Sequence, residues 1–68
     1  MSGADLVRMA NQIAGFFAAY PRDEAVAGVA DHLKKFWDPA MRRDLIELAA
    51  ANPAALHDLV AGAIPELA

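Results

Sequence analysis

The sequence predicts an all-α fold, a small compact bundle of three main helices plus a short fourth helix at the C-terminus. Apolar residues recur at the spacing i, i+3, i+4, i+7, which places them on one face of a helix. No stretch alternates apolar and polar residues as a strand would. Two pairs, Asp38-Pro39 and Asn52-Pro53, divide the second half of the chain. Asp and Asn are favoured N-caps and proline fits the first helical position, so each pair predicts a helix start.

The first helix is expected to begin after Ser2, which forms a variant capping box with Asp5 three residues later. It is expected to continue to Tyr20, because Pro21 biases the residue before it away from helical geometry. One apolar stripe at helical spacing extends along the whole length: Leu6, Met9, Ala10, Ile13, Phe16, Phe17 and Tyr20.

The second helix is expected to begin at the acidic segment 22–24, since acidic side chains favour the positive end of a helix. Trp37 is predicted to be a structural core residue, because it shares one side of this helix with Val26, Ala30 and Leu33. Phe36 is offset from that side by about 100° and is expected to be partly exposed. Gly28 costs about 1 kcal/mol against alanine, and we expect it to permit close contact with another backbone.

A third helix is predicted from Pro39 to about Ala51, with Asp38 as its structural cap. Its inner side would consist of Met41, Leu45, Leu48 and Ala49. The Asn52-Pro53 pair is expected to start the fourth helix, which would fray after about Ala63. The apolar face of this fourth helix would be Leu56, Leu59, Val60, Ala63 and Leu67.

Residues 1–68 are expected to form a single domain with a modest core. The apolar fraction is 57%, but 17 of these residues are alanine, which contributes little burial. Chains this short gain much of their stability from a staple or a partner. Disulfides and thiolate metal sites are excluded because the chain contains no cysteine.

Neither a catalytic nor a metal site is expected. Ser2 is the only serine and there is no cysteine, so Ser2 is the only candidate nucleophile of these types. No glycine-rich phosphate loop is present. His32 and His57 each adjoin an aspartate but have no third ligand at a recognisable spacing. There is no apolar run of about 18 residues and no secretory signal, so the cytoplasm is the expected location and a membrane partner is not expected.

The net charge of −3 is distributed unevenly. Between His32 and Arg43, four basic residues and one aspartate give +3, so the rest of the chain carries −6. Such a dipole could steer an acidic partner, although a solvated basic turn explains it equally well. A DNA-binding helix-turn-helix usually has a turn of about 3–4 residues. Here Asp38 leads directly into Pro39 and the chain is acidic, which argues against a nucleic-acid partner.

Two groups of residues are candidate partner contacts. His32 lies one helical turn before Phe36, so the two rings can stack. Together with Arg42 they would form an aromatic and arginine anchor of the composition that interfaces favour. Asn11 beside Arg8 is more typical of a solvated face, but its amide could bond to the backbone of a partner.

The order and spacing of several short segments resemble the delta subunit of NAD-dependent formate dehydrogenase. The resemblance covers roughly residues 6–48, and the segment after Ala49 matches poorly. It departs from the family at Ala40, where the common form has arginine, and Arg43 supplies a positive charge three positions later. The matching segments are Arg8-Met9-Ala10-Asn11-Gln12-Ile13, Phe16-Phe17, Tyr20-Pro21, Val29-Ala30, His32-Leu33, Phe36-Trp37-Asp38-Pro39 and Met41-Arg42.

The resemblance implies a non-catalytic accessory subunit of a cytoplasmic complex that oxidises formate with NAD. Its proposed roles in the family are to stabilise the complex and to help the cofactor-loaded alpha subunit assemble. The molybdenum or tungsten pterin, the iron–sulfur clusters and the FMN would lie in other subunits, and this chain would bind no cofactor. We hypothesise that the residues facing the alpha subunit are Arg8, Asn11, His32, Phe36 and Arg42. A DNA-binding module and a free-standing protein that forms a weak homo-oligomer stay open as alternatives.

Overall fold

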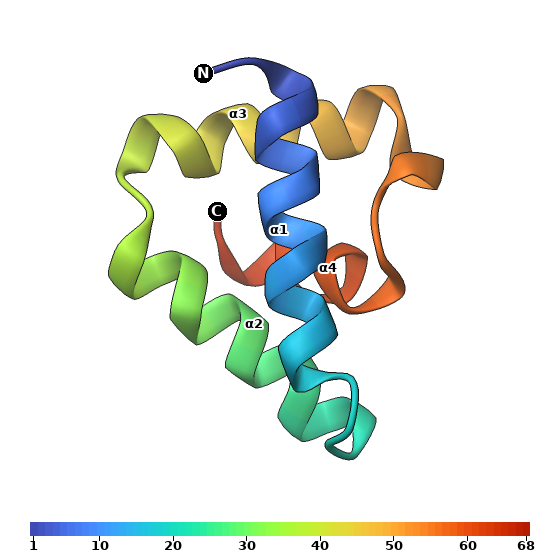
Figure 1. Ribbon diagram of the computed structural model, residues 1–68. Coiled ribbons are helices and arrows are strands. Elements are labelled where there is room, and N and C mark those ends of the chain that lie inside the picture. Colours follow the sequence, from blue (N-terminus) through green and yellow to red (C-terminus); the bar gives the residue numbers. More distant parts are fainter.

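Four α-helices and two short 3-10 turns make up the fold in the computed structural model, which describes residues 1–68 (Figure 1). The N-terminal half of helix α1 crosses α3, and the C-terminal half of α1 crosses α2. Helix α4 lies behind α1. No strand is present, so the predicted all-α class is confirmed. In chain order the elements are α1 (Gly3–Phe17), α2 (Arg22–Phe36), α3 (Pro39–Ala51), η1 (Pro53–Ala55), α4 (Asp58–Ala63) and η2 (Ile64–Glu66).

Side-chain caps fix the starts of α1 and α3, as the sequence predicts. The Oγ of Ser2 accepts a hydrogen bond from the Asp5 N–H at 3.1 Å, and the Ser2 N–H donates to the Asp5 carboxylate at 3.4 Å. These two bonds, and secondarily the nearby Arg8 guanidinium, hold the pKa of Asp5 below its ordinary value. At α3, the Asp38 carboxylate accepts the Met41 N–H at 2.8 Å, and Pro39 occupies the first turn. The predicted bounds of α3 are confirmed.

The core is thin and contains only apolar side chains. Five of its twelve buried residues are alanines, and the largest fully buried side chains are only leucines and valines. Trp37 is 5% exposed, so its predicted place in the core is confirmed. Helix α2 packs more extensively against α4 than against any other element. The buried set is Leu6, Ala10, Ala14, Ala25, Val29, Ala30, Leu33, Trp37, Leu45, Leu59, Val60 and Ala63.

The prediction that α1 continues to Tyr20 is wrong. The helix ends at Phe17, and residues 18–20 form a turn closed by the Tyr20 N–H, which donates to the Phe17 carbonyl at 3.0 Å. The chain has to reverse before Pro21 so that α2 can pack against α1. As a result Phe16 is 81% exposed and Tyr20 is 56% exposed, and the apolar stripe does not stay buried to its end.

The prediction that Asn52-Pro53 starts the fourth helix is also wrong. The Asn52 side chain makes no cap hydrogen bond, and Pro53 begins only the turn η1. Leu56 and His57 then adopt extended geometry, with ψ of 139° and 144°. Helix α4 starts afterwards, where the Nδ1 of His57 accepts the Leu59 N–H at 3.1 Å. The chain continues beyond α4 as the turn η2.

Gly28 does permit a close approach, but to a side chain rather than to the expected backbone. The ring of Phe17 lies over it, so a Cβ at position 28 would stand 2.5 Å from Phe17 Cε1. The glycine therefore sets how closely the C-terminal end of α1 packs against α2.

Candidate protein-interaction site

The α2–α3 corner, defined here as residues 32–43, exposes one aromatic side chain and buries the next. Helix α2 ends at Phe36, whose side chain is 72% exposed. Trp37 follows in extended geometry, with φ −94° and ψ 138°, and enters the core. Because Trp37 anchors the corner inside, Phe36 is held on the outside.

His32 supports the exposed ring of Phe36. Their ring centroids lie 4.8 Å apart with an angle of 43° between the ring planes. The predicted stacking of this pair along α2 is therefore confirmed. His32 itself is half-buried, so the pair forms a continuous aromatic surface that begins on the helix and ends at the corner.

Arg42 holds the corner together from within the chain. Its Nη1 donates to the carbonyl oxygens of Lys34 at 3.0 Å and Trp37 at 2.6 Å. These carbonyls belong to the C-terminal end of α2, which otherwise lacks intrahelical donors and attracts positive charge. The sequence suggested Arg42 as a partner contact, and the structure gives it a positioning role for the α2–α3 corner.

The charges around the corner are mainly positive. Lys35 forms an exposed ion pair with Asp31 at 3.0 Å. Lys34 and Arg43 are exposed and form no ion pair within the chain. The Asp38 carboxylate caps α3 through the Met41 N–H and forms no ion pair, so the corner exposes two free cationic groups, Lys34 and Arg43, and one capping carboxylate.

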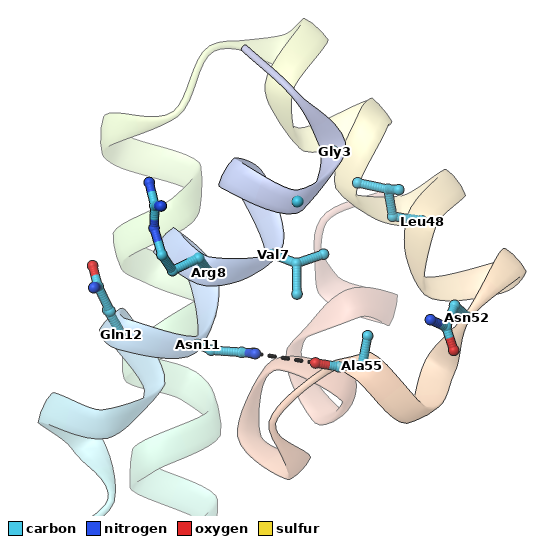
Figure 2. Close-up of a pocket in the computed structure, with 9 residues that line it drawn as sticks. Gly3, Val7, Arg8, Asn11, Gln12, Leu48, Asn52 and Ala55 are labelled. Carbon is cyan, nitrogen blue, oxygen red and sulfur yellow. Dashed lines mark hydrogen bonds between the residues drawn. The ribbon is translucent and has the colours of Figure 1, made fainter.

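A second surface feature is a groove between α1 and the α3–η1 segment, with a volume of about 690 Å³ (Figure 2). Val7 points into it and Leu48 forms its opposite wall, whereas Arg8 and Gln12 point away from that wall. Arg8 pairs with Asp5 at 3.2 Å, and both side chains are substantially exposed. The lining residues are Gly3, Ala4, Val7, Arg8, Asn11, Gln12, Leu48, Asn52 and Ala55.

Asn11 binds the backbone of its own chain rather than leaving its amide free. Its Nδ2 donates to the Ala55 carbonyl at 3.1 Å, as Figure 2 shows, and its Oδ1 accepts the His57 N–H at 2.9 Å. Each of these bonds joins residues that are more than forty positions apart in the sequence. Asn11 therefore ties α1 to the segment that leads into α4.

The five predicted contact residues fall on two surface features. His32, Phe36 and Arg42 form the α2–α3 corner, whereas Arg8 and Asn11 line the groove. Sequence reasoning missed Val7 as a wall of that groove, although Val7 directly follows the first member of the apolar stripe. It also missed the exposure of Phe16, which matches the helical spacing of buried residues.

The histidines and carboxylates have structural partners or lie apart. No group of three or more His, Asp or Glu side chains is close enough to hold a metal ion. His32 stacks on Phe36 and His57 caps α4. No helix has both the length and the apolar character needed to cross a bilayer. What the surface does present is an exposed aromatic pair, free cationic groups and an apolar groove.

These features define a small all-helical protein whose surface is suited to binding another macromolecule. The family model of the NADH-dependent formate dehydrogenase delta subunit, FdsD, matches residues 5–64. The chain therefore belongs to the FdsD family, as its resemblance indicated, and the match extends beyond Ala49 into the C-terminal segment. Neither the curated proteins nor the solved structures gave a match to this chain.

Proposed function

We propose that this chain is a non-catalytic accessory subunit of a cytoplasmic NAD-dependent formate dehydrogenase complex. In this role it stabilises the complex or assists assembly of the cofactor-loaded alpha subunit. The observation that supports the proposal is the family match over residues 5–64, whose description names a delta subunit. The alpha subunit is the partner that the family resemblance implies.

The thin core gives a physical reason for docking. A domain of 68 residues with five alanines among twelve buried residues has little apolar burial to stabilise it. A partner that binds only the folded chain stabilises it by an amount that grows with the logarithm of the partner concentration divided by Kd. The surface proposed to face the alpha subunit contains His32 and Phe36, with Arg42 positioning the corner. Arg8 and Asn11 would contribute through the neighbouring groove.

We also propose that the redox cofactors of the complex are bound by other subunits. An iron–sulfur cluster normally requires thiolate ligands, and this chain contains no cysteine. Its histidines and carboxylates do not gather into a group that could replace them. The donor set of this chain therefore does not fit an iron–sulfur or metal centre. That the molybdenum or tungsten pterin and the FMN lie in other subunits is what the family resemblance implies.

The test is a pull-down with the tagged chain from its native cytosol. The eluate is assayed for formate-dependent NAD reduction and for molybdenum and tungsten. Co-purification of the large subunits with activity is the result expected for a resident subunit. Recovery of the alpha subunit alone, inactive and poor in metal, would assign the chain to assembly. Recovery of neither would refute the proposed function.

A further inference from the structure

We propose that the α2–α3 corner docks on an acidic surface of the partner subunit, and that this surface contains an apolar pocket for Phe36. The identity of the partner rests on the proposed function. The chemistry of its surface is inferred from the corner itself, from the exposure of Phe36 and from the charges of Lys34 and Arg43.

Phe36 has the properties of an interface anchor. It is 72% exposed at the last position of a helix, and the half-buried His32 stacks on its ring at 4.8 Å. Because the ring is already restrained, less conformational entropy is lost when a partner encloses it. Large aromatic side chains seated in partner pockets contribute much of the binding free energy of typical interfaces.

The charge distribution selects an acidic partner. Lys34 and Arg43 form no ion pair within the chain, and the Asp38 carboxylate, which caps α3 through the Met41 N–H, pairs with neither of them. The segment from His32 to Arg43 carries +3, and the remainder of the chain carries −6. An acidic surface therefore attracts the corner and repels the rest of the molecule. This dipole orients the chain during approach, so the corner arrives first.

The corner is also well placed for contact. The connection between α2 and α3 lies at one margin of the molecule, at the left of Figure 1, away from α4. Arg42, from α3, bonds to the Lys34 carbonyl in α2 at 3.0 Å and to the Trp37 carbonyl in the connection at 2.6 Å, which restrains the connection. The groove between α1 and α3 lacks this charge, because its one cation, Arg8, is paired with Asp5 and its other polar groups are amides.

Binding kinetics of the full chain test the proposal. The remainder of the complex, purified without this subunit, is immobilised, and the chain is applied at about 50 and about 300 mM KCl. Phe36→Ala is expected to raise the dissociation rate about tenfold or more, with the association rate within about twofold of wild type. Lys34→Gln and Arg43→Gln are each expected to slow association about two- to fivefold at low salt, with dissociation nearly unchanged. The effect of these two charge variants is expected to vanish at high salt.

Two matched controls separate the corner from general effects. Phe16→Ala removes an aromatic ring of equal size that is 81% exposed on α1, and it is expected to leave the dissociation rate unchanged. Ala27→Glu changes the net charge by the same amount as Lys34→Gln. Ala27 is exposed on the same side of α2, two helical turns or about 10 Å before Lys34. This spacing is within the Debye length at about 50 mM KCl, so its variant is expected to slow association, but less than half as much as Lys34→Gln does. Circular dichroism melts verify that every variant is folded.

The outcomes distinguish this proposal from the proposed function. If the chain binds but Phe36→Ala behaves like Phe16→Ala, or Lys34→Gln like Ala27→Glu, the corner is not the docking surface. The accessory role would survive that result. If the wild-type chain does not bind the remaining subunits at all, the proposed function fails. A salt-dependent affinity for duplex DNA that Lys34→Gln weakens clearly more than Ala27→Glu does would assign the corner to phosphate binding and overturn an acidic protein partner.

Discussion

Replacing Gly28 with alanine tests how tightly α1 packs against α2. The added Cβ would lie 2.5 Å from Phe17 Cε1, 2.6 Å from Cδ1 and 3.1 Å from Cζ. These distances are too short for carbon atoms in contact, so the Phe17 ring has to move. Overpacking of this kind costs about 1–3 kcal/mol, and the better helix propensity of alanine returns about 1 kcal/mol. We expect Gly28→Ala to lower the free energy of unfolding by up to about 2 kcal/mol.

Gly15 provides the matched control for this substitution. It also lies inside a helix, but a Cβ there would meet nothing within 4 Å. Gly15→Ala should therefore show only the propensity gain and stabilise the chain by up to about 1 kcal/mol. The difference between the two variants measures the packing cost of about 1–3 kcal/mol.

Thermal and urea unfolding followed by circular dichroism report both effects. In a domain of this size, 1 kcal/mol corresponds to a shift in Tm of about 4–8 °C. Gly28→Ala should become stabilising in a Phe17→Ala background, because the clashing ring is gone. If Gly28→Ala raises Tm as much as Gly15→Ala in the wild-type background, the Phe17 ring does not rest on Gly28 and the described packing is wrong.

Three further predictions concern side chains bonded within the chain. Asn11→Ala removes both bonds to the segment before α4 and is expected to cost about 1–3 kcal/mol in urea unfolding; a neutral result would show that these bonds do not hold the segment. Arg42→Ala should cost about 1–3 kcal/mol by releasing the α2 carbonyls, whereas the exposed neighbour variant Arg43→Ala should stay within about 0.5 kcal/mol; equal effects would contradict the positioning role. The folded-state pKa of Asp5 lies below its ordinary 3.8, so its stabilising effect is present above that pH and is lost as the pH falls through the folded pKa. Wild type should therefore lose more stability than Ser2→Ala between pH 5 and pH 2, and parallel pH profiles would argue against the capping box.

The two proline junctions show what local sequence can and cannot predict. Asp38-Pro39 and Asn52-Pro53 look equivalent in the sequence, and the first gives the predicted helix. At the second, the side-chain cap is missing and the helix is delayed to Asp58. The decisive contacts come from Asn11, more than forty residues away in the sequence. A pattern of neighbouring residues such as Asn52-Pro53 cannot predict hydrogen bonds to a residue more than forty positions away.

The same limit applies to the interaction site. The angular positions of these residues around the predicted helix correctly indicated that Trp37 is buried while Phe36 is exposed. Their spacing also correctly indicated that His32 stacks on Phe36. These patterns could not separate Phe16 from Phe17, because both match the apolar spacing and only the position of Gly28 on α2 selects Phe17 for packing. Nor could residue type show that Arg42 is engaged with the α2 carbonyls, since an arginine beside aromatics suits a partner contact equally well.

Cross-linking from position 36 inside the assembled complex tests most directly the claim that this chain is an accessory subunit that docks through its corner. A photoreactive phenylalanine analogue replaces Phe36 in the full chain, and a second preparation carries it at Phe16. The complex is purified in its active form, irradiated and analysed by mass spectrometry. We expect cross-links from position 36 to a peptide of the large catalytic subunit that is rich in Asp and Glu, with few from position 16. Cross-links from position 16 alone, or from position 36 only to a second copy of this chain, would contradict it.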